Sequence, residues 1–270
     1  MNKIIPLNRL FLMALLSGYL IGCSQKDDPQ AELAAPAVPS AATLDMKIYT
    51  FSEKDNSNGR TMAEGKLNAF YAGLGFNIWT AILKLQVAVP SVALNEAFKQ
   101  TPTLTSDGQW LWTYSVEAVD NYQVKLYAKD QGDEQVGWEM YLSKEGFFQD
   151  YLWITGTSDR SSKQGQWIVN REGAELMRVD WKKASSDTVT ELTYTHLEAE
   201  SKYEGSYVKY QTLSEGDYNV AYSVYLSNED NKLNINYHTE TLVGRVSNKK
   251  HFDDEAWHCW NSDFEDVSCE

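Results

Sequence analysis

The chain has few cysteines, no excess of positive charge and none of the short motifs that mark nucleotide-binding or nucleophilic enzymes. Its 270 residues include three cysteines, and 38 acidic against 24 basic residues give a formal net charge of −14. A chain this acidic repels phosphate backbones, which argues against a nucleic-acid partner and against docking on anionic lipid by a basic patch. No Gly-X-Ser-X-Gly elbow, phosphate loop or dinucleotide fingerprint occurs. Nucleophilic catalysis and nucleotide chemistry therefore have no support, and we expect no cofactor.

The N-terminus follows the plan of a secretory signal peptide. Lys3 and Arg9 precede an apolar run over residues 10–21, and the run ends in Leu20-Ile21-Gly22-Cys23. This run of about 12 residues is too short to span a bilayer, which needs about 20. The Leu-Ile-Gly-Cys ending resembles the lipobox of bacterial lipoproteins. The resemblance implies cleavage before Cys23, removal of residues 1–22 and a diacylglycerol on the Cys23 thiol.

The residues that follow Cys23 carry a second resemblance. The sequence Cys23-Ser24-Gln25-Lys26-Asp27-Asp28 is similar to the export signal of surface-exposed lipoproteins of the Bacteroidota. In that family a short Gln-Lys-acidic tag routes the protein to the outer leaflet. The resemblance therefore implies an outer-membrane protein that is exposed at the cell surface. The alternative is that Gln25, Lys26, Asp27 and Asp28 are only the polar start of a tether.

Residues 23–43 are predicted to form a disordered tether. The segment contains Pro29, Pro36 and Pro39 and almost no large apolar side chain. Such a composition cannot bury enough surface to offset the entropy lost on ordering. The remaining residues, 44–270, suit one β-rich domain.

Residues 66–100 are predicted to be helical, with a kink or restart at Pro90 and an end at Pro102. Apolar side chains recur there at steps of three and four residues, at Phe70, Leu74, Ile78, Ile82, Leu85 and Val89. The narrow polar stripe consists of Asn77, Thr80 and Lys84. This pattern predicts a helix that is buried over most of its circumference inside the protein rather than in a bilayer.

From Gln109 onward the period of the apolar residues changes to two. Trp110, Trp112, Tyr114 and Val116 alternate with polar neighbours, and similar runs follow, separated by turn signals. We expect about eleven strands between residues 109 and 247, in an antiparallel meander. A sheet this wide must curl, which favours an open barrel or half-barrel. The fold class is thus mainly β (α+β), with the helical segment packed on the concave aromatic face.

This layout resembles the lipocalin barrels and, more closely, the helix-plugged half-barrels of periplasmic lipoprotein carriers. The resemblance lies in strand number and arrangement. Three segments, Trp138–Gly146, His251–Asp253 and Trp257–Trp260, also look like parts of an uncharacterised Bacteroidota lipoprotein family. That resemblance implies the class and the location of the protein but no chemistry.

Cys259 and Cys269 remain once Cys23 carries lipid. An even pair in an oxidising compartment predicts a disulfide, and a metal-binding pair is the alternative. The densest group of possible metal ligands is His251, Asp253, Asp254, Glu255 and His258. Its spacing matches no metal motif, so we interpret it as a polar C-terminal segment and expect no metal.

Two pairs of carboxylates are candidates for the acid and base of a glycosidase, Glu139 with Asp150 and Asp180 with Glu191. The alternation places Glu139 on the face opposite to Trp138, toward solvent. The tryptophans Trp110, Trp112, Trp138, Trp153, Trp167 and Trp181 are expected mostly to pack on the helix. The alternative is that some of them stack on sugars or line an apolar pocket.

We therefore expect a lipid-anchored surface lipoprotein that is not an enzyme and that binds a glycan, a lipid or a protein. A surface hydrolase that uses the strand carboxylates is the alternative, and so is a structural protein of the outer membrane. The catalytic residues of such a hydrolase are not assigned.

Overall fold

A computed structural model describes residues 34–49, 51, 65–117, 121–184 and 188–269 of the chain. The chain divides into two units, Met1–Ala34 and Ala35–Glu270. The description below concerns the second unit, which begins at Ala35 rather than at the predicted residue 44. The predicted signal peptide, residues 1–22, lies outside the described residues.

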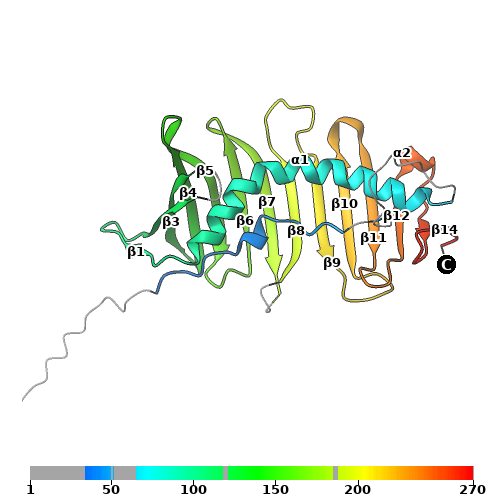
Figure 1. Cartoon of the computed structure of the whole chain (residues 1–270), viewed down its shortest axis with the longest axis horizontal. Coiled ribbons are helices and arrows are strands. Elements are labelled where there is room, and N and C mark those ends of the chain that lie inside the picture. Colours follow the sequence, from blue (N-terminus) through cyan, green and yellow to red (C-terminus); the bar gives the residue numbers. More distant parts are fainter. Residues whose placement is uncertain (1–33, 50, 52–64, 118–120, 185–187, 270) are drawn as a thin grey trace, which may run out of the picture. The chain divides into compact units, whose positions relative to one another are not determined.

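The second unit is built on one open antiparallel sheet of 14 strands (Figure 1). The strands follow one another in chain order from β1 to β14, so that each pairs with its sequence neighbours and the two edge strands do not meet. The predicted open, mainly β fold is therefore confirmed, and the interval from 109 to 247 contains β2 to β12, the eleven strands expected there. The strands are β1 (Thr103–Leu104), β2 (Trp110–Val116), β3 (Tyr122–Gly132), β4 (Gln135–Lys144), β5 (Phe148–Asp159), β6 (Gln164–Arg171), β7 (Ala174–Lys183), β8 (Val189–His196), β9 (Tyr207–Thr212), β10 (Val220–Leu226), β11 (Asn231–Tyr237), β12 (Gly244–Ser247), β13 (His258–Trp260) and β14 (Asp266–Val267).

One face of the sheet is buried and the other faces water. In β4, for example, Trp138 and Met140 are buried while Glu139 between them is exposed, as the alternation predicts. Helix α1 (Leu67–Ala97) runs across the strands on the buried face (Figure 1). Three shorter helices complete the described part of the chain: η1 (Ala41–Thr43), η2 (Ser227–Glu229) and α2 (Lys249–Phe252).

The orientation of α1 about its own axis differs from the sequence prediction. The buried positions follow a different line along the helix, which includes Ala72, Phe76, Thr80 and Leu94. Thr80 was predicted to lie in a polar outer stripe, but its side chain is 1 % exposed and its hydroxyl donates to the carbonyl of Phe76 at 2.9 Å. Leu85 was predicted to be buried and is 79 % exposed. The side chains of Ile78 and Ile82 lie outside the described residues.

The physical reason for this orientation is the size of the side chains on the sheet. The buried face carries Trp and Tyr, which leave little height for large residues on a helix packed against them. The helix therefore turns Ala69, Ala72 and Ala97 toward the sheet. At Gly75 an added Cβ would lie 2.9 Å from Cδ2 of Leu233. Small residues therefore determine which side of α1 packs against the sheet. The spacing of the large apolar residues does not reveal this.

Helix α1 is continuous through Pro90 but bent by 53° between Leu67–Ala81 and Leu83–Ala97. The predicted kink or restart does not fall at Pro90, because the bend lies near residue 82, on the N-terminal side of the Gln86 carbonyl that the Pro90 ring would crowd. Among the described residues no single helix is long and apolar enough to cross a membrane, and the two halves of α1 meet that test only as a bent pair.

Residues 35–49 and Phe51 lie on the buried face beside α1, although residues up to 43 were predicted to be a tether. Their backbone and Thr43 bind polar atoms of the sheet's aromatic side chains. Trp167 Nε1 donates to Thr43 Oγ1 at 2.9 Å, and the Tyr222 hydroxyl donates to the carbonyl of Lys47 at 3.0 Å. The Tyr194 hydroxyl donates to Leu44 O at 2.9 Å and accepts from Met46 N at 3.0 Å. Tyr and Trp are thus suited to this face because they combine apolar bulk with a polar end.

Replacement of Tyr194 by Phe should lower the free energy of unfolding by about 1–3 kcal/mol, because a buried carbonyl and a buried N–H both lose their partner. Denaturant unfolding of the purified chain measures this loss. The matched control is Tyr225→Phe, since the Tyr225 hydroxyl donates to Asp230 at an exposed site. Equal losses in the two variants would contradict the described role of Tyr194.

Candidate functional site

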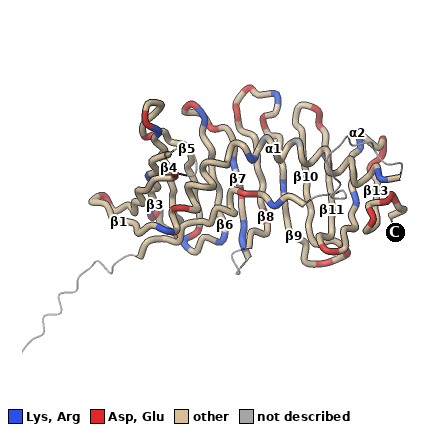
Figure 2. Tube along the Cα trace, in the orientation of Figure 1, with Lys and Arg blue, Asp and Glu red and all other residues tan. Residues whose placement is uncertain are grey.

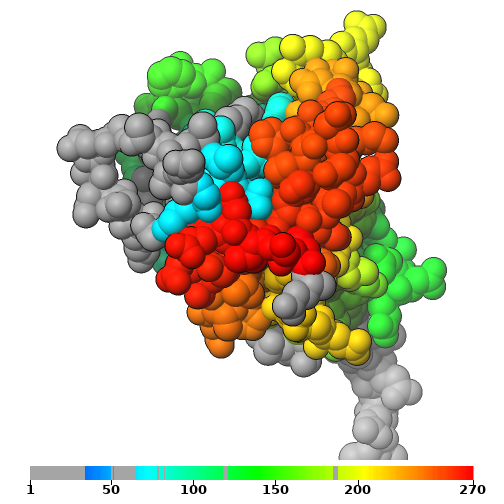
Figure 3. Space-filling model, turned by 90° about the vertical axis from the view of Figure 1, so that its right-hand side faces the viewer, coloured from blue at the N-terminus to red at the C-terminus, as the bar shows by residue number. Residues whose placement is uncertain are grey.

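The C-terminal segment holds the N-terminus of α1 (Figure 3). The Asp266 carboxylate accepts from the backbone N–H groups of Leu67 at 3.1 Å and Asn68 at 3.0 Å. These are donors that a helix cannot satisfy within itself, and a carboxylate there also complements the helix dipole. Residue Lys66 at the start of the helix makes no side-chain cap, so the cap comes from the far end of the chain.

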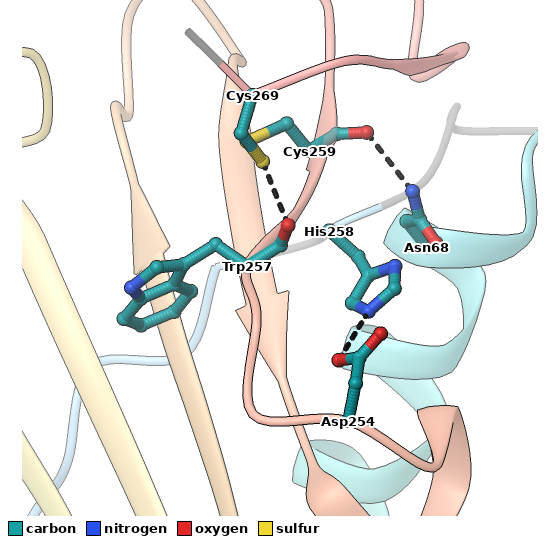
Figure 4. Close-up of a disulfide and its surroundings, with 6 residues drawn as sticks. All are labelled: Asn68, Asp254, Trp257, His258, Cys259 and Cys269. Carbon is teal, nitrogen blue, oxygen red and sulfur yellow. Dashed lines mark hydrogen bonds and ion pairs between the residues drawn. A yellow bond between two sulfur atoms is a disulfide. The ribbon is translucent and has the colours of Figure 1, made fainter.

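The predicted pairing of Cys259 with Cys269 is present at disulfide geometry, with the two Cα atoms 5.3 Å apart (Figure 4). Cys259 is buried in β13 and its carbonyl accepts from Asn68 Nδ2 of α1 at 3.0 Å. The bridge therefore closes the terminal hairpin that carries Asp266. Its role in this structure is to fasten the C-terminus to α1.

The C-terminal histidines and acids bind their neighbours. His258 Nε2 lies 3.0 Å from Oδ1 of Asp254, and this hydrogen bond lowers the pKa of that carboxyl (Figure 4). His251 stacks on Tyr71 with the ring centres 3.6 Å apart, and burial lowers its pKa. Glu255 pairs with Lys249 at 2.8 Å. Within the described ranges no three His, Cys, Asp or Glu side chains come together as a metal site.

The first carboxylate pair, Glu139 and Asp150, lines one open cleft of about 390 Å³ on the exposed face of the sheet. Glu139 accepts from the Tyr141 hydroxyl at 2.9 Å, and Asp150 pairs with Lys125 Nζ at 2.8 Å. Burial and the bond to Glu139 raise the pKa of Tyr141 to about 12. The T-shaped rings of Tyr127 and Tyr141, with centres 5.8 Å apart, complete a polar cleft with aromatic edges.

The second pair, Asp180 and Glu191, lines another open cleft of about 350 Å³ farther along the same face. Asp180 accepts from Arg178 Nε at 2.8 Å, and Glu191 pairs with Lys182 at 3.2 Å. Each carboxylate of the two predicted pairs except Glu139 is therefore ion-paired with a basic side chain. The structure brings the members of each pair into a common cleft but gives each a partner of its own.

A third depression lies on the other face, at the edge of α1, and we call it the aromatic groove. It has a volume of about 320 Å³ and is open to solvent. Its apolar walls come from one residue of α1, three aromatic residues of β5 and one residue each of β6 and β7: Leu85, Phe148, Tyr151, Trp153, Val169 and Leu176. The ring centres of Tyr151 and Trp153 are 5.7 Å apart, and Phe148 lies 5.6 Å from Tyr151.

Irregular strand pairing forms the aromatic groove. The register between β4 and β5 shifts between Met140 and Tyr141, which leaves Trp153 without a ladder partner, and shifts again before Lys144. Bulges of this kind re-aim side chains. Between the two shifts Tyr151 is paired with the buried Leu142, so Tyr151 lies on the buried face and lines the groove together with Trp153. A further shift between β6 and β7 leaves Leu176 unpaired in the same way.

The aromatic groove also contains polar groups. The Nδ2 atom of Asn170 is buried and has no hydrogen-bond partner. Arg171, at the same wall, is paired with Glu198 at a half-exposed site. A buried amide donor without a partner lowers the stability of the protein, and a hydrogen-bond acceptor on a ligand would restore that free energy. The groove is thus apolar with one polar group inside, the usual composition of a small-molecule site.

The sequence identified only part of the aromatic groove. Trp112, Trp138, Trp167 and Trp181 are buried, whereas Trp153 is only partly buried and lines the groove. Phe148 and Tyr151 were missed. The available signal was a break in alternation, because Phe148, Tyr151 and Trp153 do not share one parity as residues of a regular strand face must.

The predicted lipidation site Cys23 and the predicted export tag Gln25, Lys26, Asp27 and Asp28 lie outside the described residues. The depressions of the described residues include the aromatic groove on the α1 side and the two polar clefts on the opposite face. Comparison of the chain with protein-family models, with curated proteins and with solved structures finds no match.

Proposed function

We propose that this chain is a lipid-anchored lipoprotein of the outer membrane, displayed at the cell surface, that binds an apolar ligand without transforming it. The observation that carries the binding proposal is the aromatic groove, where Phe148, Tyr151 and Trp153 stand open beside Leu85. Aromatic walls, a depression of about 320 Å³ and the unpaired Asn170 amide suit a ligand with an apolar body and an acceptor group, such as a fatty acid.

Titration with decanoate, followed by tryptophan fluorescence and calorimetry, tests the ligand class. Trp153→Ala should weaken binding about tenfold or more, which corresponds to about 1.4 kcal/mol. Trp110→Ala is the matched control, because Trp110 is also partly buried but lies on β2 away from the groove, and it should leave the affinity unchanged. Absence of binding, or equal weakening in both variants, would reject the groove as the ligand site.

The lipid anchor is tested separately. Cys23→Ser removes the thiol that the lipobox places at the cleavage site, so the variant should leave the membrane fraction for the soluble fraction in detergent phase separation. Each buried methylene of a lipid chain contributes about 0.8 kcal/mol to anchoring. A chain without the lipid therefore loses the whole of this free energy and should no longer partition into the membrane. A Cys23→Ser chain that still partitions with lipid would refute the anchor.

Surface display is expected to depend on the residues after the cysteine. Replacement of Lys26, Asp27 and Asp28 by Ala should leave the chain in the membrane fraction but hide it from protease added to whole cells. Equal digestion of the variant and the unchanged chain would reject the export-signal interpretation and leave the anchor intact.

A glycan is the second candidate, because Glu139 and Asp150 share a cleft with the rings of Tyr127 and Tyr141. Either binding or hydrolysis would use these groups, since two carboxylates and aromatic edges are common in sugar sites. Nitrophenyl glycosides and soluble polysaccharides distinguish the two: hydrolysis that is lost in Glu139→Gln supports an enzyme, and binding without hydrolysis supports a glycan module.

A further inference from the structure

The side of α1 that faces away from the sheet carries a line of apolar residues, which we call the outer stripe. It consists of Leu67, Leu74, Ala81, Leu85 and Ala88, all exposed and spaced so that they share one side of the helix. Leu85 is 79 %, Leu67 47 % and Leu74 42 % exposed. An isolated exposed leucine needs no explanation, but a line of them along one helix indicates a surface that is covered in use.

The composition of α1 supports the same conclusion. The only charged residues between Leu67 and Ala97 are Lys84 and Glu96. Figure 2 shows that the charges of the described residues lie mainly on the strands and their connections. A helix on the surface of a water-soluble protein normally turns charged side chains outward. Here Lys84 turns to Asp45 of the N-terminal segment, at 3.0 Å.

The N-terminal segment indicates what covers the outer stripe. Residues 43–47 bind aromatic side chains of the sheet face that carries α1, and Ala35 packs against the same core. The 12 residue steps from Cys23 to Ala35 reach at most about 40 Å when extended. An anchor at Cys23 would therefore keep Ala35 within about 40 Å of the bilayer.

Trp79 of α1 is not part of the outer stripe, because it lies about 140° around the helix from Leu74 and packs against the core. Trp79 of α1 meets Tyr203 with the ring centres 5.5 Å apart, and Lys202 lies over the Tyr203 ring at 4.8 Å.

We propose that the outer stripe of α1 lies in the interface of the bilayer to which the Cys23 lipid anchors the chain. This inference rests on the proposed lipid anchor. The contact itself need only be weak, since the anchor converts it into an intramolecular event at high effective concentration. The domain then lies with α1 toward the lipid and with the polar face of the sheet, where Glu139 and Asp180 are found, toward the outside.

Fluorescence quenching on the lipidated full-length chain tests this orientation. Leu74→Cys, which lies in the outer stripe but not in the aromatic groove, is labelled with an environment-sensitive dye and reconstituted in phosphatidylcholine–phosphatidylethanolamine vesicles that contain brominated acyl chains. The matched control is Lys232→Cys, an exposed residue of β11 whose neighbour Leu233 faces α1. The label at residue 74 should shift to the blue and be quenched several-fold more than the label at residue 232.

Flotation of the same samples separates the inference from the proposal on which it rests. Chains that float with the vesicles but show equal quenching at both labels would overturn the orientation and leave the anchor intact. Chains that do not float would overturn both. A blue shift at residue 74 that is as large in the vesicle-free Cys23→Ser chain, and that grows with protein concentration, would assign the outer stripe to a second copy and overturn the bilayer as its occupant.

Discussion

Replacement of Gly156 by Ala should destabilise the protein by about 3 kcal/mol, the upper range for overpacking a core. Gly156 of β5 lies directly across from Trp167 of β6, and the indole ring covers the glycine. An added Cβ would lie 2.6 Å from the Gln166 carbonyl oxygen and closer still to the ring. The carbonyl belongs to the sheet and the ring is buried between Trp138 and Trp181, so neither can move cheaply.

The matched control for this prediction is Gly137→Ala in the neighbouring strand β4. An added Cβ there would meet only the side chain of Gln131, which is exposed and flexible. Its effect on the free energy of unfolding should be less than about 1 kcal/mol, because the reduced entropy of the unfolded chain offsets a small adjustment. Denaturant unfolding of both variants measures the difference, and similar losses would show that the ring over Gly156 is not fixed as described.

Replacement of Phe76 by Ala should cost about 3–5 kcal/mol, as for other large apolar side chains removed from a core. Phe76 is fully buried at the centre of the contact between α1 and the sheet, with its ring 4.2 Å from Tyr222 and 5.8 Å from Phe51. The cavity left by its removal would lie beneath a helix that other side chains hold in place, so the site cannot collapse fully.

Leu85→Ala is the comparison that determines the orientation of α1. Leu85 is 79 % exposed, so its truncation should change the free energy of unfolding by about 0.5 kcal/mol or less. The spacing of large apolar residues along the sequence predicts instead that Leu85 is buried and that its truncation is costly. A loss at Leu85 as large as that at Phe76 would therefore restore the sequence-based orientation and remove the outer stripe.

Much of the sheet could be predicted from the sequence because each strand must bury one face. Trp138 and Met140 alternate with Glu139, and this period of two is fixed by the geometry of an extended chain. The same argument yields the number of strands between residues 109 and 247 and their antiparallel order, since the turns between them are too short for a crossover.

The aromatic groove could not be predicted in this way. It depends on register shifts that leave Trp153 and Leu176 unpaired, and a shift is a property of two strands together. Tyr151 lies on the α1 side because of its pairing with Leu142, which no pattern within β5 alone specifies. The N-terminal boundary at Ala35 is similar, because the partners of residues 43–47 are Trp167, Tyr194 and Tyr222, far along the chain.

The sequence by itself determined the class of the fold, the existence of the helix and the pairing of Cys259 with Cys269, because these depend on local periodicity and on a small number of cysteines. It also provides the proposed address at Cys23. Only the tertiary structure decided which side of α1 is buried, where the N-terminal segment lies and that Asp266 caps α1 from the other end of the chain. These features depend on the fit between distant surfaces, where a small residue such as Gly75 lies against a large one such as Leu233. An apolar pattern records hydrophobicity but not shape.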